Sequence, residues 1–274
     1  MTRYVSLCLA LALLGACNGS DPGEPGGDAT AAEGVPVEGA AATPSPTATP
    51  TPAGARSVSE ETDDFVFDYS YPAEAGNIPE LAALLDGRLE RSRTRIAQQA
   101  AQGRSEAREN GFPFNKYSSG MEWSVVADLP GWLSLSGKQS SYTGGAHGIY
   151  GMQSLVWDKR AAEAIDGIDL FTSPEALGTA LGQRYCEGLN ALRTERGIEP
   201  LDEDTIFAAC PSMDELTVLV GSSNRGTFDR LTLYAGPYLA GAYVEGAYAV
   251  DLDIDAAVLD AVKPAYRESF SARN

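Results

Sequence analysis

Histidine is the scarcest reactive residue in this chain, because His147 is the only one. A zinc hydrolase or deacetylase site needs several histidine ligands, so a histidine-rich metal centre cannot be built here. The sequence also lacks the G-x-S-x-G, H-E-x-x-H, P-loop and G-x-G-x-x-G patterns, which argues against the hydrolase, metalloprotease and nucleotide sites that use them. We therefore expect no metal and no cofactor, and we find no complete catalytic set.

Long apolar runs are also missing, and none approaches the length of about 20 residues that a membrane-spanning helix needs. The run at residues 5–14, VSLCLALALL, carries no charge and follows Arg3. This arrangement is typical of a signal peptide. The run ends at Leu14-Gly15-Ala16-Cys17, which resembles the lipobox of bacterial lipoproteins. We predict a signal peptide at residues 1–16; an ordinary secretory signal with an incidental cysteine is the alternative.

The lipobox resemblance implies that Cys17 carries a diacylglycerol and becomes the mature N-terminus. Two or three acyl chains hold a protein firmly to a bilayer, since each buried CH₂ contributes about 0.8 kcal/mol. Asn18 stands where an aspartate would favour retention in the inner membrane. We therefore expect the lipid bilayer as a partner, and a lipid-anchored protein at the periplasmic face of the envelope, with the outer membrane favoured over the inner.

Bulky side chains are scarce directly after the lipobox. Residues 18–55 contain no aromatic residue, and Val35 and Val37 are their only bulky apolar side chains. Such a segment cannot bury enough surface to offset its ordering entropy, and the proline-rich part at 43–52 favours an extended chain. We predict a disordered tether at residues 17–60, acting either as a spacer or as a leader without a selected length.

Positive charge is in short supply. The chain has 20 Lys and Arg against 38 Asp and Glu, giving a formal net charge of −18. An acidic protein repels nucleic acid and anionic lipid, so we expect no nucleic-acid partner. The charge favours a cationic partner protein, unless it serves only solubility.

Cysteine is limited to four residues. Cys8 lies in the predicted signal and Cys17 is the predicted lipidation site, which leaves Cys186 and Cys210. An even pair in an oxidising compartment predicts a disulfide, which would contribute about 3 kcal/mol by closing its loop. Two buried thiols or a metal site are the alternatives, and the absence of a C-x-x-C pair disfavours the metal.

The apolar pattern beyond residue 61 predicts strands and helices in separate runs, and thus an α+β fold of antiparallel sheets packed with several helices. The predicted strands are 65–71, 117–128, 132–142, 149–158, 163–170, 216–221, 227–234 and 243–254. The predicted helices are one from Pro79 to a break at 103–114, one from Ser173 to Gly197, and shorter ones at 202–210, 256–262 and 264–270. Arginines at 88, 91, 93 and 95 are interpreted as a solvated helix face.

Two glycine-rich stretches supply the candidate ligand-binding residues, which are Tyr142, Gly144, Gly145, His147 and Tyr238. The first stretch, YTGGAHG at 142–148, lies between two predicted strands. Its histidine is either a general base or ligand contact, or a ring bonded to backbone in a tight loop. In the second, Gly236-Pro237-Tyr238, tyrosines on a glycine-rich frame suit recognition, or they lie half-buried at a sheet edge.

These stretches also carry a family resemblance. YTGGAHG at 142–148, the later Ile168-Asp169-Leu170-Phe171 and Gly236-Pro237-Tyr238 resemble the extracytoplasmic region shared by RsiV-type anti-sigma factors and PdaC-type peptidoglycan deacetylases. The resemblance covers roughly residues 62–255, and the hairpin at 158–163 departs from the family pattern.

The resemblance implies two modules, a deacetylase-associated N-terminal module at 61–170 and an RsiV-like C-terminal module at 171–274. It also implies binding, since RsiV-type proteins bind lysozyme through this region, whereas PdaC-type enzymes carry their chemistry in a separate domain. We predict a binding or sensing module for a cell-wall-related ligand, either a lysozyme-type hydrolase or peptidoglycan. A cell-wall hydrolase or deacetylase-related enzyme using His147 is the alternative.

A Cys17→Ala substitution tests the anchor. We expect the variant to take up no lipid in metabolically labelled cells and to leave the membrane fraction or keep its signal uncleaved. Cys8→Ala is the matched control and should remain labelled. Full labelling of Cys17→Ala would contradict the lipobox interpretation.

Overall fold

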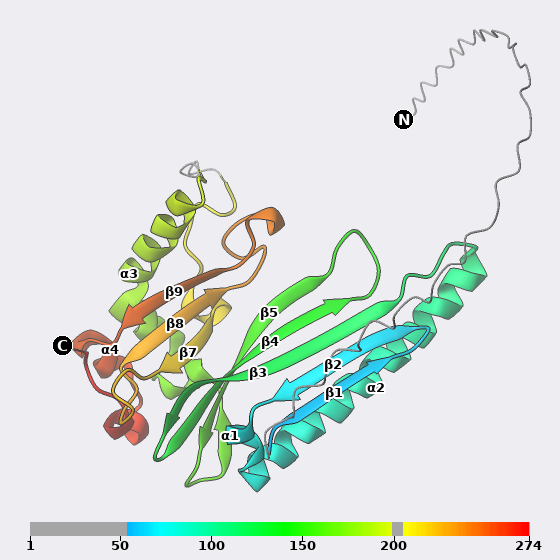
Figure 1. Ribbon diagram of the computed structural model, residues 1–274. Helices are drawn as coiled ribbons and strands as arrows, with labels where there is room; N and C mark the ends of the chain where they lie inside the picture. Colours follow the sequence, from blue (N-terminus) through cyan, green and yellow to red (C-terminus); the bar gives the residue numbers. More distant parts are fainter. Residues whose placement is uncertain (1–53, 199–204, 274) are drawn as a thin grey trace, which may run out of the picture. The chain divides into compact units, whose positions relative to one another are not determined.

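The computed structural model describes residues 54–198 and 205–273, which form a mixed α+β fold with two sheets (Figure 1). The predicted fold class is confirmed. The signal, Cys17 and residues 17–53 of the tether lie outside the described residues. Within the described residues, no helix is long and apolar enough to cross a membrane.

The first sheet has the strand order β1-β2-β3-β4-β5-β6, and the second has the order β7-β8-β9. The elements of the first half are β1 (Arg56–Glu61), β2 (Phe65–Tyr71), α1 (Ala73–Gly76), α2 (Pro79–Asn110), β3 (Tyr117–Leu129), β4 (Trp132–Tyr142), β5 (Ile149–Asp158), β6 (Glu163–Ile165) and the 3₁₀ turn η1 (Gly167–Leu170). Those of the second half are α3 (Pro174–Glu195), η2 (Met213–Glu215), β7 (Thr217–Gly221), β8 (Arg230–Ala235), η3 (Tyr243–Glu245), β9 (Tyr248–Asp253), α4 (Ala256–Ala261) and η4 (Pro264–Ser269).

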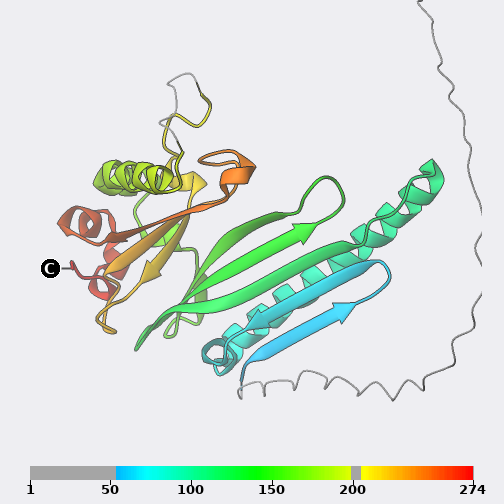
Figure 2. The ribbon, with the colours of Figure 1, turned by 45° about the horizontal axis from the view of Figure 1, so that its top comes forward.

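Helix α2 is the crossover that lets β2 and β3 run parallel, whereas the other paired strands of both sheets are antiparallel. It lies along one face of the first sheet (Figure 2). Strand β2 alternates strictly, so its aromatic side chains point to one face. The buried residues that α2 and β2 share in this core are Phe65, Phe67, Tyr69, Tyr71, Leu81, Leu85, Leu89 and Ile96.

The predicted break of this helix at 103–114 is wrong, because α2 continues to Asn110. Gly103 is needed for close packing: a Cβ there would lie 2.3 Å from the Tyr117 hydroxyl. The helix ends instead at Gly111, whose φ of 72° is the left-handed conformation of a helix C-terminus.

A second core joins the second sheet, α3, α4 and part of β3 and β5. Helix α3 begins as predicted, with the Ser173 side chain accepting a hydrogen bond from the Ala176 amide. Its buried residues are Leu177, Leu181, Tyr185, Leu189 and Arg193, whereas Leu192 is only half-buried. Val156 of β5 and Ala127 of β3 belong to this core, so the first sheet contributes side chains to two cores.

Further predicted elements differ in their bounds or type. The strand predicted at 227–234 starts at Arg230, and the helix predicted at 264–270 is the 3₁₀ turn η4. The strand predicted at 163–170 stops at Ile165, because Asp166 accepts a hydrogen bond from the Ile168 amide and begins the turn η1. The strand predicted at 243–254 starts only at Tyr248, since the Glu245 carboxylate bonds the Ala242 amide and holds η3. The helix predicted at 202–210 is absent from its described part, 205–210, which forms turns and bends.

Regular structure starts earlier than the predicted tether boundary at 60. Strand β1 begins at Arg56 and pairs with β2 along its full length. Its sequence carries little apolar signal because it is an edge strand. An ion pair between Glu60 of β1 and Arg93 of α2 helps to hold this strand in place. Because the two residues are far apart in the sequence, no local pattern predicts the pair.

The predicted disulfide is present. Cys186 of α3 is bonded to Cys210, with the two Cα atoms 5.7 Å apart. The bond ties α3 to the segment before η2. The described part of that segment contains no helix or strand. The disulfide therefore attaches it to α3 in place of the backbone hydrogen bonds of a regular element.

Replacing both cysteines with serine should lower the free energy of unfolding by about 3 kcal/mol, because the open loop gains entropy in the unfolded chain. Denaturant unfolding measures this change. A reducing agent should destabilise the parent protein equally and leave the double variant unchanged. If reduction left the parent protein's stability unaltered, the stabilising role of the bond would be refuted.

Candidate functional site

The loop at 142–148 closes the hairpin between β4 and β5. Gly144 and Gly145 have φ of 96° and 93°, a region that favours glycine. The Tyr142 hydroxyl donates a hydrogen bond to the Gly145 carbonyl at 3.1 Å. These three candidate residues therefore have a structural task, which is to shape the turn that presents His147.

His147 is exposed at the end of this turn and has a polar contact at each ring nitrogen. Nδ1 lies 2.9 Å from the Gly148 carbonyl oxygen, and Nε2 lies 3.1 Å from the Tyr238 hydroxyl. A carbonyl can only accept, so Nδ1 carries the proton, and Nε2 of the neutral ring accepts from the tyrosine. The His147 ring therefore forms a hydrogen bond to the backbone of its own loop, and it also contacts Tyr238, a second candidate ligand-binding residue.

Tyr238 comes from the distant 236–238 turn, 91 residues along the chain from His147. Its φ is 69°, although it is not glycine, and its side chain is 52% exposed. For a bulky residue, this backbone conformation costs on the order of 1–2 kcal/mol. The conformation belongs to a turn in which the Leu239 amide donates to the Gly236 carbonyl, and this turn leaves the Tyr238 ring exposed.

Tyr243 completes the arrangement and was not among the predicted candidates. Its ring stacks on His147 with centroids 3.8 Å apart and planes inclined by 20°. Its hydroxyl donates to the Gly148 carbonyl at 2.6 Å. The sequence pattern placed Tyr243 inside a strand, so only the observed turn η3 reveals its position. We call His147, Tyr150, Tyr238 and Tyr243 the aromatic cluster, because each ring contacts another of the set.

The charged groups near this cluster are engaged elsewhere. Glu245 accepts hydrogen bonds from the Tyr248 hydroxyl and the Ala242 amide. Burial raises the pKa of Tyr248, and the bond to Glu245 raises it further, so this pair is a structural one. In residues 54–198 and 205–273, no carboxylate, serine or cysteine side chain is hydrogen-bonded to His147, and no group of acids, histidines and cysteines is arranged to hold a metal.

The class of domain follows from the fold: an α+β module in which a long helix joins two parallel strands and a glycine-rich hairpin follows. Within the sequence, residues 58–150 match the family model described as "Deacetylase PdaC". The match confirms the predicted resemblance to PdaC-type proteins, and a domain of this kind fits an extracytoplasmic module. The match includes the 142–148 loop but ends before Tyr238 and Tyr243.

Solved structures similar to this chain include a DUF3298 family protein from Pseudomonas aeruginosa PAO1. It has 17% sequence identity and a TM-score of 0.48, and the match covers 82% of this chain and 99% of that chain. A member of the DUF3298 family from Bacteroides fragilis NCTC 9343 has 14% identity and a TM-score of 0.48, covering 78% and 95% of the two chains. No curated protein matches the sequence.

Backbone strain at Tyr238 can be measured with a pair of substitutions. Tyr238→Gly and Tyr238→Ala both remove the ring, but only glycine relieves the positive φ. We expect the glycine variant to be more stable than the alanine variant by about 1 kcal/mol in denaturant unfolding. Equal stability of the two variants would show that the position carries no strain.

Proposed function

We propose that this chain is a binding or sensing module of the cell envelope, anchored by lipid at Cys17, and that the aromatic cluster is its recognition surface. One observation carries the proposal: the exposed rings of His147 and Tyr238 pack with the half-buried ring of Tyr243, and the three residues come from two loops far apart in the sequence. Each ring is held by contacts to the others or to the Gly148 carbonyl.

Such a stack suits recognition on physical grounds. Tyrosine and histidine rings offer a large amphipathic contact area with few rotatable bonds, so little entropy is lost on binding. The loops that carry them are fixed by two sheets, which is the usual arrangement of a binding loop on a rigid scaffold. The net charge of −18 favours a basic partner and speeds the encounter with it.

The ligand class comes from the family resemblance, which implies either a lysozyme-type hydrolase or peptidoglycan. A lysozyme is basic and therefore complementary to this acidic chain. The lipid anchor and Asn18 would place the module at the periplasmic face of the envelope, with the outer membrane favoured. We propose no nucleic-acid partner, since the charge repels phosphate backbones.

A hydrolase is the alternative, and one contact favours it. The Tyr238 hydroxyl donates to a histidine whose other nitrogen is fixed by a carbonyl, the order expected for a base and its proton donor. Among the described residues, however, no acidic or second nucleophilic side chain joins this pair. A binding role needs no further group.

Titration calorimetry with lysozyme and co-sedimentation with purified peptidoglycan test the proposal at about 150 mM salt, where the Debye length of about 8 Å screens unspecific attraction. We expect the full chain to bind at least one of the two. Tyr238→Ala and Tyr243→Ala should each weaken binding about tenfold, in the range of an interface hot spot. Val244→Ala is the matched control, because Val244 is a neighbour that is 92% exposed.

The Tyr238→Phe variant separates binding from catalysis. It keeps the ring and loses the hydroxyl, so a binding surface should retain most of its affinity. Failure of both ligands to bind, or an equal loss for Val244→Ala, would overturn the proposal. Release of soluble fragments from peptidoglycan that stops in Tyr238→Phe would establish the hydrolase instead.

A further inference from the structure

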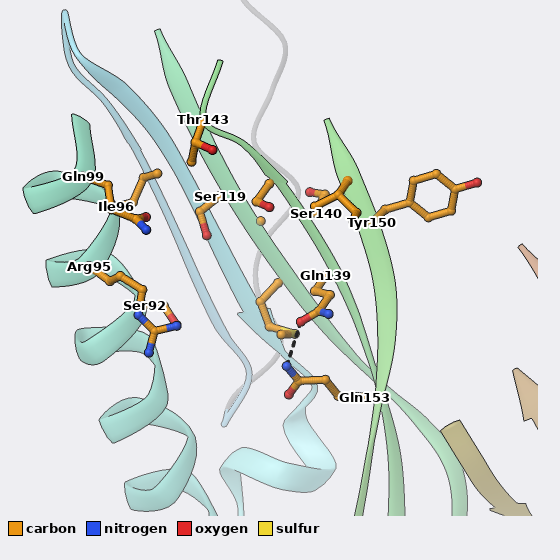
Figure 3. A pocket seen from close by; sticks show the side chains of 14 residues that line it. Ser92, Arg95, Ile96, Gln99, Ser119, Gln139, Ser140, Thr143, Tyr150 and Gln153 are labelled. Atoms are coloured by element: carbon orange, nitrogen blue, oxygen red, sulfur yellow. Dashed lines mark hydrogen bonds between the residues drawn. The ribbon is translucent and has the colours of Figure 1, made fainter. Parts of the chain in front are cut away.

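A polar groove runs between α2 and the strands β3, β4 and β5 (Figure 3). It consists of a hollow of about 460 Å³ and a second one of about 410 Å³. The two hollows share Ser92, Arg95, Met121 and Gln153 and are therefore continuous. By helix rise, the stretch of α2 from Arg88 to Gln99 that borders them is about 16 Å long.

Uncharged hydrogen-bonding groups form the floor of this groove. The Gln153 amide nitrogen donates to the Gln139 amide oxygen at 2.8 Å, as the dashed line in Figure 3 shows. This bond leaves the nitrogen of Gln139 and the oxygen of Gln153 free of any other side-chain partner among the described residues. Hydroxyl groups also line this hollow, together with the apolar side chains of Ile96, Met121 and Ile149, and they belong to Ser92, Ser119, Ser140, Ser141 and Thr143.

Three arginines form the wall on the helix side. Arg88, Arg91 and Arg95 recur at intervals of three and four residues and so share one helix face. Arg88 lies over the Trp123 ring, 5.5 Å from its centroid. In the described part of the chain, none of the three forms an ion pair, whereas Arg93, on another face of the same helix, is paired with Glu60.

This arrangement is unusual for a chain with a net charge of −18. One carboxylate, Asp166, lines the groove, and it lies at the end where Arg88 lies. It is engaged by the Ile168 amide. Apart from Asp166, whose charge interacts with Arg88, the lining of the groove carries no carboxylate. The charges of Arg91 and Arg95 are therefore available to an anion from outside.

We propose that this α2 groove binds an acidic saccharide, with the arginines holding carboxylates and the amides and hydroxyls of the floor holding sugar hydroxyls. Arginine is suited to carboxylates, because its planar fork can donate two parallel hydrogen bonds. The helix rise separates Arg88 from Arg95 by about 10 Å, a length comparable with one disaccharide repeat. A polymer with an acid on every second sugar matches that spacing.

The shape and lining favour a saccharide over other anions. A bilayer surface is flat and cannot enter a groove beside a helix. An acidic peptide would also satisfy the arginines and could bond the floor through its backbone amides, so an acidic peptide is the comparison that the binding test must include. Tyr150 lines this groove and also contacts Tyr243 of the aromatic cluster, but its side chain points away from the helix (Figure 3). The arginines on which the inference depends lie outside the aromatic cluster, so the inference goes beyond the proposed function and is tested separately from it.

Binding of a hyaluronan hexasaccharide to the purified full chain tests the inference, by calorimetry at about 150 mM salt. The neutral chitin hexasaccharide and hexaglutamate are the comparison probes for sugar without acid and acid without sugar. We expect hyaluronan to bind about tenfold or more tightly than either probe. Arg91→Gln combined with Arg95→Gln should weaken binding about tenfold, the effect of losing a charge-assisted bond. Gln139→Ala should weaken it as well.

Matched controls separate the groove from net charge and from folding. Arg93→Gln with Arg108→Gln removes the same charge from the same helix and should leave the affinity within about twofold. Thermal unfolding checks that each variant is folded, and Tyr238→Ala should bind hyaluronan as the parent does. No binding at about 1 mM, equal binding of hexaglutamate, or an equal loss in the Arg93 and Arg108 control would each overturn the inference.

Discussion

The packing of α2 on the first sheet is the constraint on which the rest of the N-terminal half depends. Its leucine stripe covers the aromatic face of β2, and the direction of the helix makes β2 and β3 parallel. Burial of each large apolar side chain contributes roughly 1.5–3 kcal/mol. Exposure of this aromatic face to solvent would therefore be unfavourable, and α2 covers it. Strands β3 to β6 can then follow as a simple antiparallel meander, and the helix itself becomes one wall of a groove.

The opposite face of the same sheet has a different task. Ala127 and Val156 contribute to a core shared with the second sheet, α3 and α4. The Tyr243 hydroxyl bonds the Gly148 carbonyl, so the η3 turn is attached to the β4–β5 loop. The first sheet thus contributes to two surfaces. One is the aromatic cluster at the β4–β5 loop, and the other is the polar, cationic groove along α2.

Both surfaces belong to the proposals made above. The aromatic cluster offers rings held by backbone carbonyls, and the α2 groove offers hydrogen-bonding groups with unpaired arginines. Two sites of modest affinity on one chain would act together on a polymer, because the second contact is made at a high effective concentration. An acidic surface around them limits unspecific attachment to anionic envelope components.

The sequence by itself determined the elements whose signal is local. The period of β2, the caps of α3, the glycine turn at 144–145 and the pairing of Cys186 with Cys210 depend on nearby residues or on simple counting. Tertiary contacts decided the rest. Gly103 stays inside a helix because Tyr117 packs against it, and Tyr243 joins the site because η3 replaces the start of a predicted strand. Three arginines of the solvated face of α2 also border a groove, because strands from later in the chain form its other wall. In each case the deciding partner lies far along the chain, where no local pattern can register it.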